Sequence, residues 1–167
     1  MTRFSANLGF LWTDRALPDA IRAAKAAGFD AVECHWPYEV APGAVKAALA
    51  ETQLQMLGLN TRRGDVAAGD NGLAAIPGRR AEAQAMIEQA IDYAVQIGAG
   101  NIHVMAGYAK GTEALLTFID TLIWACNKAA RHGLTILIEP LNAYDAPGYF
   151  LQTTQQAAKI IEDVGAK

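Results

Sequence analysis

The chain repeats one pattern that restricts how it can fold: the end of an alanine-rich helix, a glycine, and then a short apolar strand. Three copies stand at residues 23–33, 93–104 and 128–139. A glycine fits directly after a helix because the chain adopts a positive φ there, at which a side chain would clash. Strands that alternate with helices in this way predict an α/β fold built on a parallel sheet.

The whole chain divides into five strand–helix units of this kind. Strands are expected near residues 3–8, 30–35, 54–60, 101–106 and 134–139. Helices are expected near residues 17–27, 42–51, 79–97, 112–131 and 153–164. Consecutive apolar residues, as at positions 136–138, indicate strands that are covered on both faces.

Two α/β architectures have this order of elements. A doubly wound sheet fits 167 residues, but it usually carries a Gly-rich phosphate loop after its first strand, and residues 7–12 contain none. A (β/α)8 barrel typically has about 250 residues, and eight units of about 33 residues each would reach about 265. We therefore expect residues 1–167 to be a single domain, the N-terminal part of a TIM barrel with strands six to eight missing.

Composition narrows the classes of partner. Hydrophobic residues make up 52% of the chain and charged residues 19%, so a folded core is expected. The net charge is −3, so a basic surface that binds nucleic acid is not expected. No run approaches the roughly 18 apolar residues of a membrane span, and no signal peptide is recognisable. Cys34 and Cys126 form no CxxC motif and indicate free thiols in the cytoplasm.

Polar side chains gather at the carboxyl ends of the expected strands, the face on which TIM-barrel enzymes carry their active sites. Glu139 is the strongest catalytic candidate, because an acid seldom ends an apolar strand without a partner. Its carboxylate could bind a divalent metal, Mg²⁺ or Mn²⁺, and transfer a proton. The alternative is a structural role, in which Glu139 caps the next turn or pairs with an arginine.

Five further residues are candidates for binding a substrate. Asn7, Tyr38, Asn60 and His103 could orient it, and Arg63 could clamp a carboxylate by paired hydrogen bonds. A hydrogen-bonded core histidine remains the alternative for His103, and a solvated loop residue the alternative for Arg63.

Two further features could contribute to a site. Glu33 could be a second carboxylate, although the alternation of its strand could turn it away. The long loop at about residues 61–78 is rich in Gly, Asp and Arg and is a candidate active-site loop.

Four stretches of the sequence are distinctive when they are taken together. They are residues 3–8, residues 28–33 with Pro37 and Tyr38, the loop at 64–79, and residues 138–142 with Pro147 and Gly148. In this order they resemble the hydroxypyruvate isomerase family, which includes the 2-oxo-tetronate isomerases, among the xylose isomerase-like barrels. Two positions depart from the family pattern: Leu59 stands where a histidine is usual, and Val66 stands where a tryptophan is usual.

The resemblance implies a (β/α)8 barrel that interconverts hydroxypyruvate and 2-hydroxy-3-oxopropanoate by metal-assisted proton transfer through an enediolate. It also implies that Glu139 is a metal ligand and proton carrier, with the other ligands on strands six to eight. The alternatives are an isomerase or epimerase of 2-oxo-tetronate or another sugar acid, and a metal-dependent endonuclease, which the acidic balance disfavours. A non-catalytic module whose open sheet edges pair with another chain, such as a second copy, is a further alternative.

Overall fold

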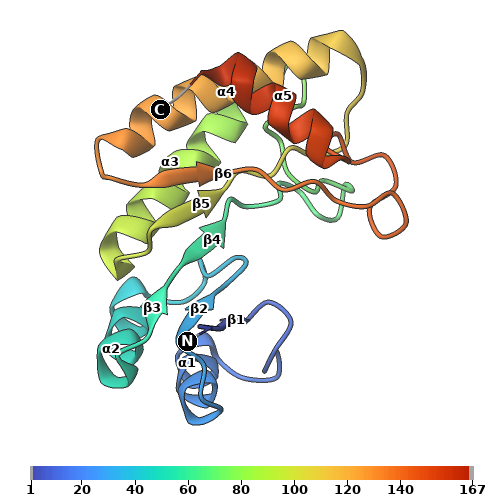
Figure 1. Ribbon diagram of the computed structural model, residues 1–167. Coiled ribbons are helices and arrows are strands. Elements are labelled where there is room, and N and C mark those ends of the chain that lie inside the picture. Colours follow the sequence, from blue (N-terminus) through green and yellow to red (C-terminus); the bar gives the residue numbers. More distant parts are fainter. Residues whose placement is uncertain (1, 166–167) are drawn as a thin grey trace.

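The computed structural model describes residues 2–165, and its elements follow the expected order (Figure 1). The helices are α1 (Leu17–Ala26), α2 (Pro42–Thr52), α3 (Arg80–Ile97), α4 (Gly111–Ala130) and α5 (Thr154–Val164). The strands are β1 (Ser5–Asn7), β2 (Ala31–Glu33), β3 (Gln55–Met56), β4 (Gly58–Asn60), β5 (Asn101–His103) and β6 (Thr135–Leu137). Each expected helix begins and ends within one residue of its predicted position, whereas the strands are shorter than predicted.

All paired strands are parallel, and each lies beside its neighbour in the sequence. The strand expected at residues 54–60 is interrupted at Leu57, which divides it into β3 and β4. The Asn101 side chain accounts for the interruption, because its amide donates to the Leu57 carbonyl at 2.6 Å. Hydrogen bonds from Leu57 N–H to the Val32 carbonyl and from Cys34 N–H to the Gly58 carbonyl still join the two halves. The two three-stranded sheets, β1–β2–β3 and β4–β5–β6, thus continue into one another with the strand order of a TIM barrel.

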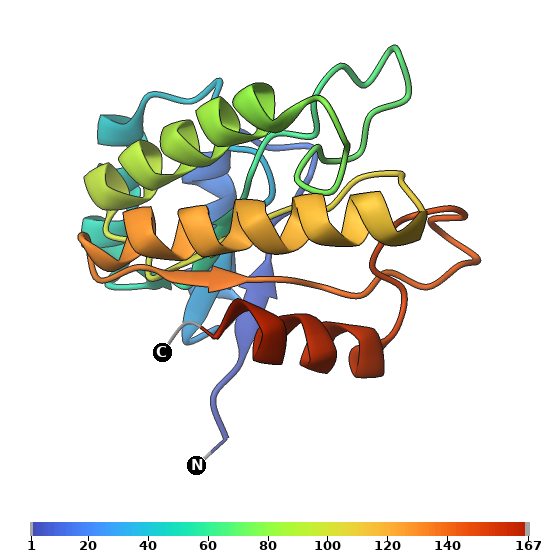
Figure 2. The same ribbon diagram turned by 90° about the horizontal axis from the view of Figure 1, so that it is seen from above.

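The helices cover the convex face of this sheet, and the core lies between the two layers (Figures 1 and 2). Val32, Leu59 and Ile102 of the strands are buried there. Small buried residues on the helices, such as Ala90 and Ala125, allow the helices to lie close to the sheet. Within residues 2–165, no helix is both long enough and apolar enough to cross a membrane.

The expectation that the strand at 134–139 is covered on both faces is wrong for the described residues. Thr135 and Leu137 of β6 are exposed, and 44% of the Leu137 surface remains accessible. The reason is that β6 pairs only with β5 among the described strands, so that its far edge and its concave face have no neighbour.

We expect a protein that consists of these 167 residues alone to self-associate. The unpaired edge of β6 and the exposed side chain of Leu137 offer both hydrogen bonds and apolar surface to a second copy. Multi-angle light scattering should therefore give a mass above that of the monomer, and Leu137→Lys should shift the mass toward the monomer value. A monomer at all concentrations for the unsubstituted chain would contradict this expectation.

Candidate active site

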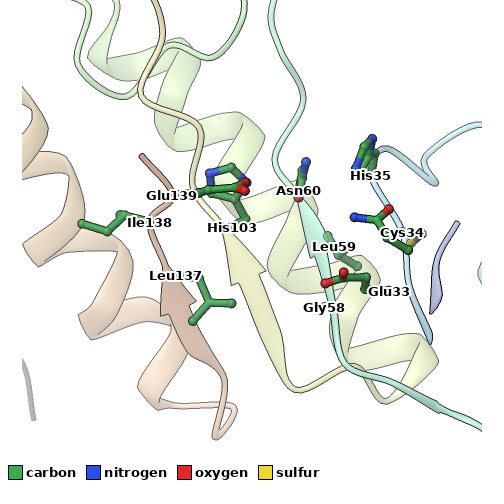
Figure 3. A pocket seen from close by; sticks show the side chains of 11 residues that line it. Glu33, Cys34, His35, Gly58, Leu59, Asn60, His103, Leu137, Ile138 and Glu139 are labelled. Carbon is green, nitrogen blue, oxygen red and sulfur yellow. The ribbon is translucent and has the colours of Figure 1, made fainter. Parts of the chain in front are cut away.

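A hollow opens on the concave face of the sheet, at the carboxyl ends of the strands (Figure 3). It has two parts: an inner hollow of about 300 Å³, lined by strand residues such as Glu33 and Leu137, and an outer hollow of about 380 Å³, to which the loops contribute. The residues that line both parts are Asn7, His35, Asn60, His103 and Glu139.

The parallel register explains why these side chains meet. Asn60 of β4, His103 of β5 and Leu137 of β6 lie side by side in the sheet. Alternate residues of a strand face the same side. Glu139, two residues beyond Leu137, therefore faces the hollow beside His103, as Figure 3 shows.

The Glu139 carboxylate is available for chemistry. Among the described residues it forms no arginine pair, and its nearest charged or titratable partner is His103, whose Nδ1 lies 3.7 Å from Glu139 Oε2. Partial burial, together with the negative charge of Glu33, raises the pKa of Glu139 above its usual value. A carboxylate with a raised pKa is a stronger base, so Glu139 suits proton transfer near neutral pH.

His103 is a buried histidine that keeps an unused hydrogen-bonding atom. Its exposed fraction is 8%, and its Nε2 has no partner among the described residues. Burial, with a smaller contribution from His35, lowers the pKa of His103 to about 4. The imidazole is therefore neutral at physiological pH, and its Nδ1, beside Glu139, can donate to or accept from a ligand oxygen.

The two asparagines are held in place by local hydrogen bonds. Asn7 Oδ1 accepts from the Gly9 N–H at 2.8 Å, which fixes the side chain at the end of β1. The Asn60 backbone is fixed from both directions: its N–H donates to the His35 carbonyl at 2.8 Å, and its carbonyl accepts from the Tyr38 hydroxyl at 2.5 Å.

Two of the predicted substrate-binding residues do not line either hollow. Tyr38 lies behind Asn60, with its ring packed edge-on against Tyr93, so it supports the end of β4. Arg63 lies over the ring of Trp36, with 4.2 Å between the guanidinium carbon and the ring centroid, and Trp36 lines the outer hollow. Among the described residues Arg63 forms no ion pair, whereas its neighbour Arg62 is paired with Glu39 at 2.6 Å.

The structure decides the orientation of Glu33, which the sequence left open, and adds one residue that the sequence did not single out. Glu33 faces the inner hollow, where its charge acts on Glu139, so the alternation of its strand does not turn it away. Its register with Asn7 on β1 is the signal that could have placed it there. Asn71, from the long loop at 61–78, lines the outer hollow, and no periodic pattern marks a residue in such a loop.

The long loop at 61–78 is anchored by an ion pair at its base. Arg79 Nη1 donates to both carboxylate oxygens of Asp70 at 2.7 Å, and the Asp65 N–H donates to the same carboxylate at 2.8 Å. Burial raises the pKa of Asp70, but these hydrogen bonds outweigh burial, so that the pKa lies below its usual value.

Asp70→Asn is expected to lower stability in a pH-dependent way. Because the pKa of Asp70 is lower in the folded state, the pair stabilises the fold above about pH 4, and this stabilisation is lost as the pH falls through the folded-state value. At pH 7 the midpoint of urea unfolding should fall by roughly 0.5 M, and the difference from the unsubstituted protein should shrink toward pH 2. Glu82→Gln, which removes a more exposed partner of the same arginine, is the control and should change the midpoint less. Equal effects of both substitutions would argue against an anchoring role for Asp70.

The described residues can supply part of a metal site. Glu139 is a hard oxygen donor, and a bound cation would favour its charged form and so lower its raised pKa. However, residues 2–165 contain no group of three or more His, Cys, Asp or Glu side chains that could hold a metal ion. Further ligands would have to come from outside these residues.

Comparisons with known proteins give consistent results. A model of the family described as "Xylose isomerase-like TIM barrel" matches residues 21–167. The 2-oxo-tetronate isomerase of Cupriavidus necator is 43% identical over 99% of this chain and 65% of its own length. A human protein named putative hydroxypyruvate isomerase is 41% identical over 98% of this chain and 62% of its own length.

Among solved structures, the protein described as AP endonuclease, family 2, from Brucella melitensis superimposes with a TM-score of 0.93 and is 34% identical. The match covers 98% of this chain and 65% of that protein. This chain therefore spans less than two thirds of the length of these relatives.

Proposed function

Because this chain belongs to the xylose isomerase-like TIM-barrel family, we propose that the protein is an isomerase that moves a proton between adjacent carbons of a small hydroxy-oxo acid. The observation that carries the proposal is the Glu139 carboxylate, in a hollow at the carboxyl ends of parallel strands. It lies beside the neutral His103 and has no arginine partner among residues 2–165. The names of the relatives support the reaction class.

The first candidate reaction interconverts hydroxypyruvate and 2-hydroxy-3-oxopropanoate. In this reaction Glu139 removes a proton from the carbon beside the carbonyl and returns it to the neighbouring carbon. His103 lines the hollow with its Nδ1 3.7 Å from Glu139 Oε2, and a hydrogen bond from this side of the ring to a substrate oxygen would stabilise the developing enediolate.

The remaining side chains hold the substrate in position. The amides of Asn7 and Asn60 face the shared part of the hollow and can bind hydroxyl or carbonyl oxygens. Arg63, which has no ion pair among the described residues, supplies a guanidinium for the carboxylate at the rim formed by Trp36. Positioning of this kind places the reacting carbon against Glu139.

A divalent metal, Mg²⁺ or Mn²⁺, would supply Lewis-acid polarisation of the substrate carbonyl when bound. Glu139 would provide one of its ligands. The full ligand set would need residues from beyond the part of the chain that the structure describes.

The second candidate substrate is 2-oxo-tetronate, a four-carbon acid. The outer hollow favours it, because this space adjoins Glu139 and leaves room for an additional carbon. A role as an endonuclease is less well supported, since the net charge of the chain is −3. In addition, the carboxylates of Glu33 and Glu139 face the inner hollow, where they would repel a phosphate backbone.

The test is direct assay of the protein at its natural length with each acid. Proton NMR should show interconversion of at least one of the two acids with its isomer when Mg²⁺ or Mn²⁺ is present. Absence of turnover with both acids, in a folded protein supplied with either metal, would overturn the proposed function.

A further inference from the structure

One side chain of the long loop, Asn71, faces the site without a partner. It lines the outer hollow together with Glu139 and His103 and is half-buried there. Its carboxamide makes no hydrogen bond with any other described residue. The other residues that line only the outer hollow contribute mainly apolar surface, and they are Gly9, Phe10, Trp36, Met105 and Leu141. Asn71 is therefore the one carboxamide that the outer hollow adds to the shared residues.

The residues on either side of Asn71 are fixed. Asp70 is bound by Arg79 and by the Asp65 N–H, as described above. Gly72 donates its N–H to the Arg63 carbonyl at 2.7 Å and pairs with Ala106 beyond β5. Because the backbone on both sides of Asn71 is anchored, little backbone entropy is lost when the side chain binds a ligand.

The chemistry of a carboxamide suits a hydroxyl group. It offers both a donor and an acceptor, as a hydroxyl requires, whereas a carboxylate accepts only. The two reacting carbons of the substrate must reach Glu139, which lines both hollows. A group that extends from Glu139 into the outer hollow therefore belongs to a carbon that does not react.

We propose that Asn71 is a specificity-determining residue that binds a hydroxyl on a non-reacting carbon of the substrate. The inference rests on the proposed function. In hydroxypyruvate the single hydroxyl is on a reacting carbon, whereas a four-carbon hydroxy-oxo acid carries one more. Asn71 thus favours the four-carbon acid over the three-carbon acid.

The experiment compares kcat/KM for hydroxypyruvate and for 2-oxo-tetronate in the unsubstituted protein and in Asn71→Ala, both at natural length. The expected result is a loss of about 10-fold to 100-fold with the four-carbon acid and a change within about 3-fold with the three-carbon acid. The three-carbon acid is the internal control, because it has no hydroxyl on a non-reacting carbon for Asn71 to bind. Asn71→Leu, which keeps a similar shape but has neither a donor nor an acceptor, serves if the alanine variant does not fold.

The possible outcomes separate this inference from the proposed function. Equal losses with both acids, or no loss with either, would overturn the role of Asn71 while the isomerase activity stands. Failure of the unsubstituted protein to convert either acid would overturn the proposed function and this inference with it.

Discussion

Glu139→Gln is expected to reduce kcat of the protein at its natural length by about 1,000-fold or more. Glutamine has almost the same shape, but it can neither accept the substrate proton nor return it. Because Glu139 makes no ion pair with an arginine in the described part of the chain, the fold should tolerate the change. The measurement is the steady-state rate of isomerisation, with circular dichroism to verify that the variant is folded.

Glu33→Gln is the matched control for this prediction. It removes a carboxylate from the same inner hollow, and the raised pKa of Glu139 should then move toward its usual value. Because Glu33 is not assigned the proton transfer, we expect a loss within about 10-fold. A rate for Glu139→Gln that is close to that of the unsubstituted protein would refute the assignment of Glu139.

Gly72→Ala is expected to destabilise the fold by about 3 kcal/mol or more. Gly72 has a φ of 104°, and a Cβ there would lie 2.5 Å from the Met105 carbonyl oxygen. Neither backbone can move easily, because Ala74 N–H also donates to the Met105 carbonyl. Urea unfolding followed by circular dichroism would measure the free energy of unfolding.

Gly69→Ala in the same loop separates the two causes of this effect. Gly69 also has a positive φ, of 93°, but an added Cβ would meet nothing within 4 Å. We expect it to cost about 1 kcal/mol, which reflects the backbone conformation alone. Equal costs for Gly69→Ala and Gly72→Ala would show that the close approach of the loop to Met105 contributes nothing to stability.

The helices could be predicted closely because their ends carry local signals. Pro18 and Pro42 stand in the first turns of α1 and α2, where a proline loses no intrahelical hydrogen bond. Gly28 and Gly98 follow helices with φ values of 88° and 75°. These signals depend on neighbouring residues only, so they can be recognised in the sequence without knowledge of the tertiary structure.

The details of the strands depended on contacts that are distant in the sequence. The interruption at Leu57 arises from the side chain of Asn101, which is 44 residues away. The exposure of Leu137 depends on which strands flank β6, and an apolar sequence does not reveal this. The predicted α/β barrel architecture is confirmed, whereas these two features were wrong or unforeseen.

The residues of the candidate site could be predicted where they stand at the carboxyl ends of strands. Asn7, Asn60, His103 and Glu139 were predicted from the carboxyl ends of strands, and the structure brings them together around one hollow. Asn71 was not predicted, since a loop has no period that shows which side chain turns inward.

The central claim, proton transfer by Glu139, is tested most directly by isomerisation in D₂O. A proton held on a carboxylate can exchange with solvent before it returns to the substrate, whereas a hydrogen that shifts directly between the two carbons cannot. NMR of the product should then show deuterium on the carbon that receives the proton. Efficient turnover with no deuterium in the product would contradict transfer through this carboxylate.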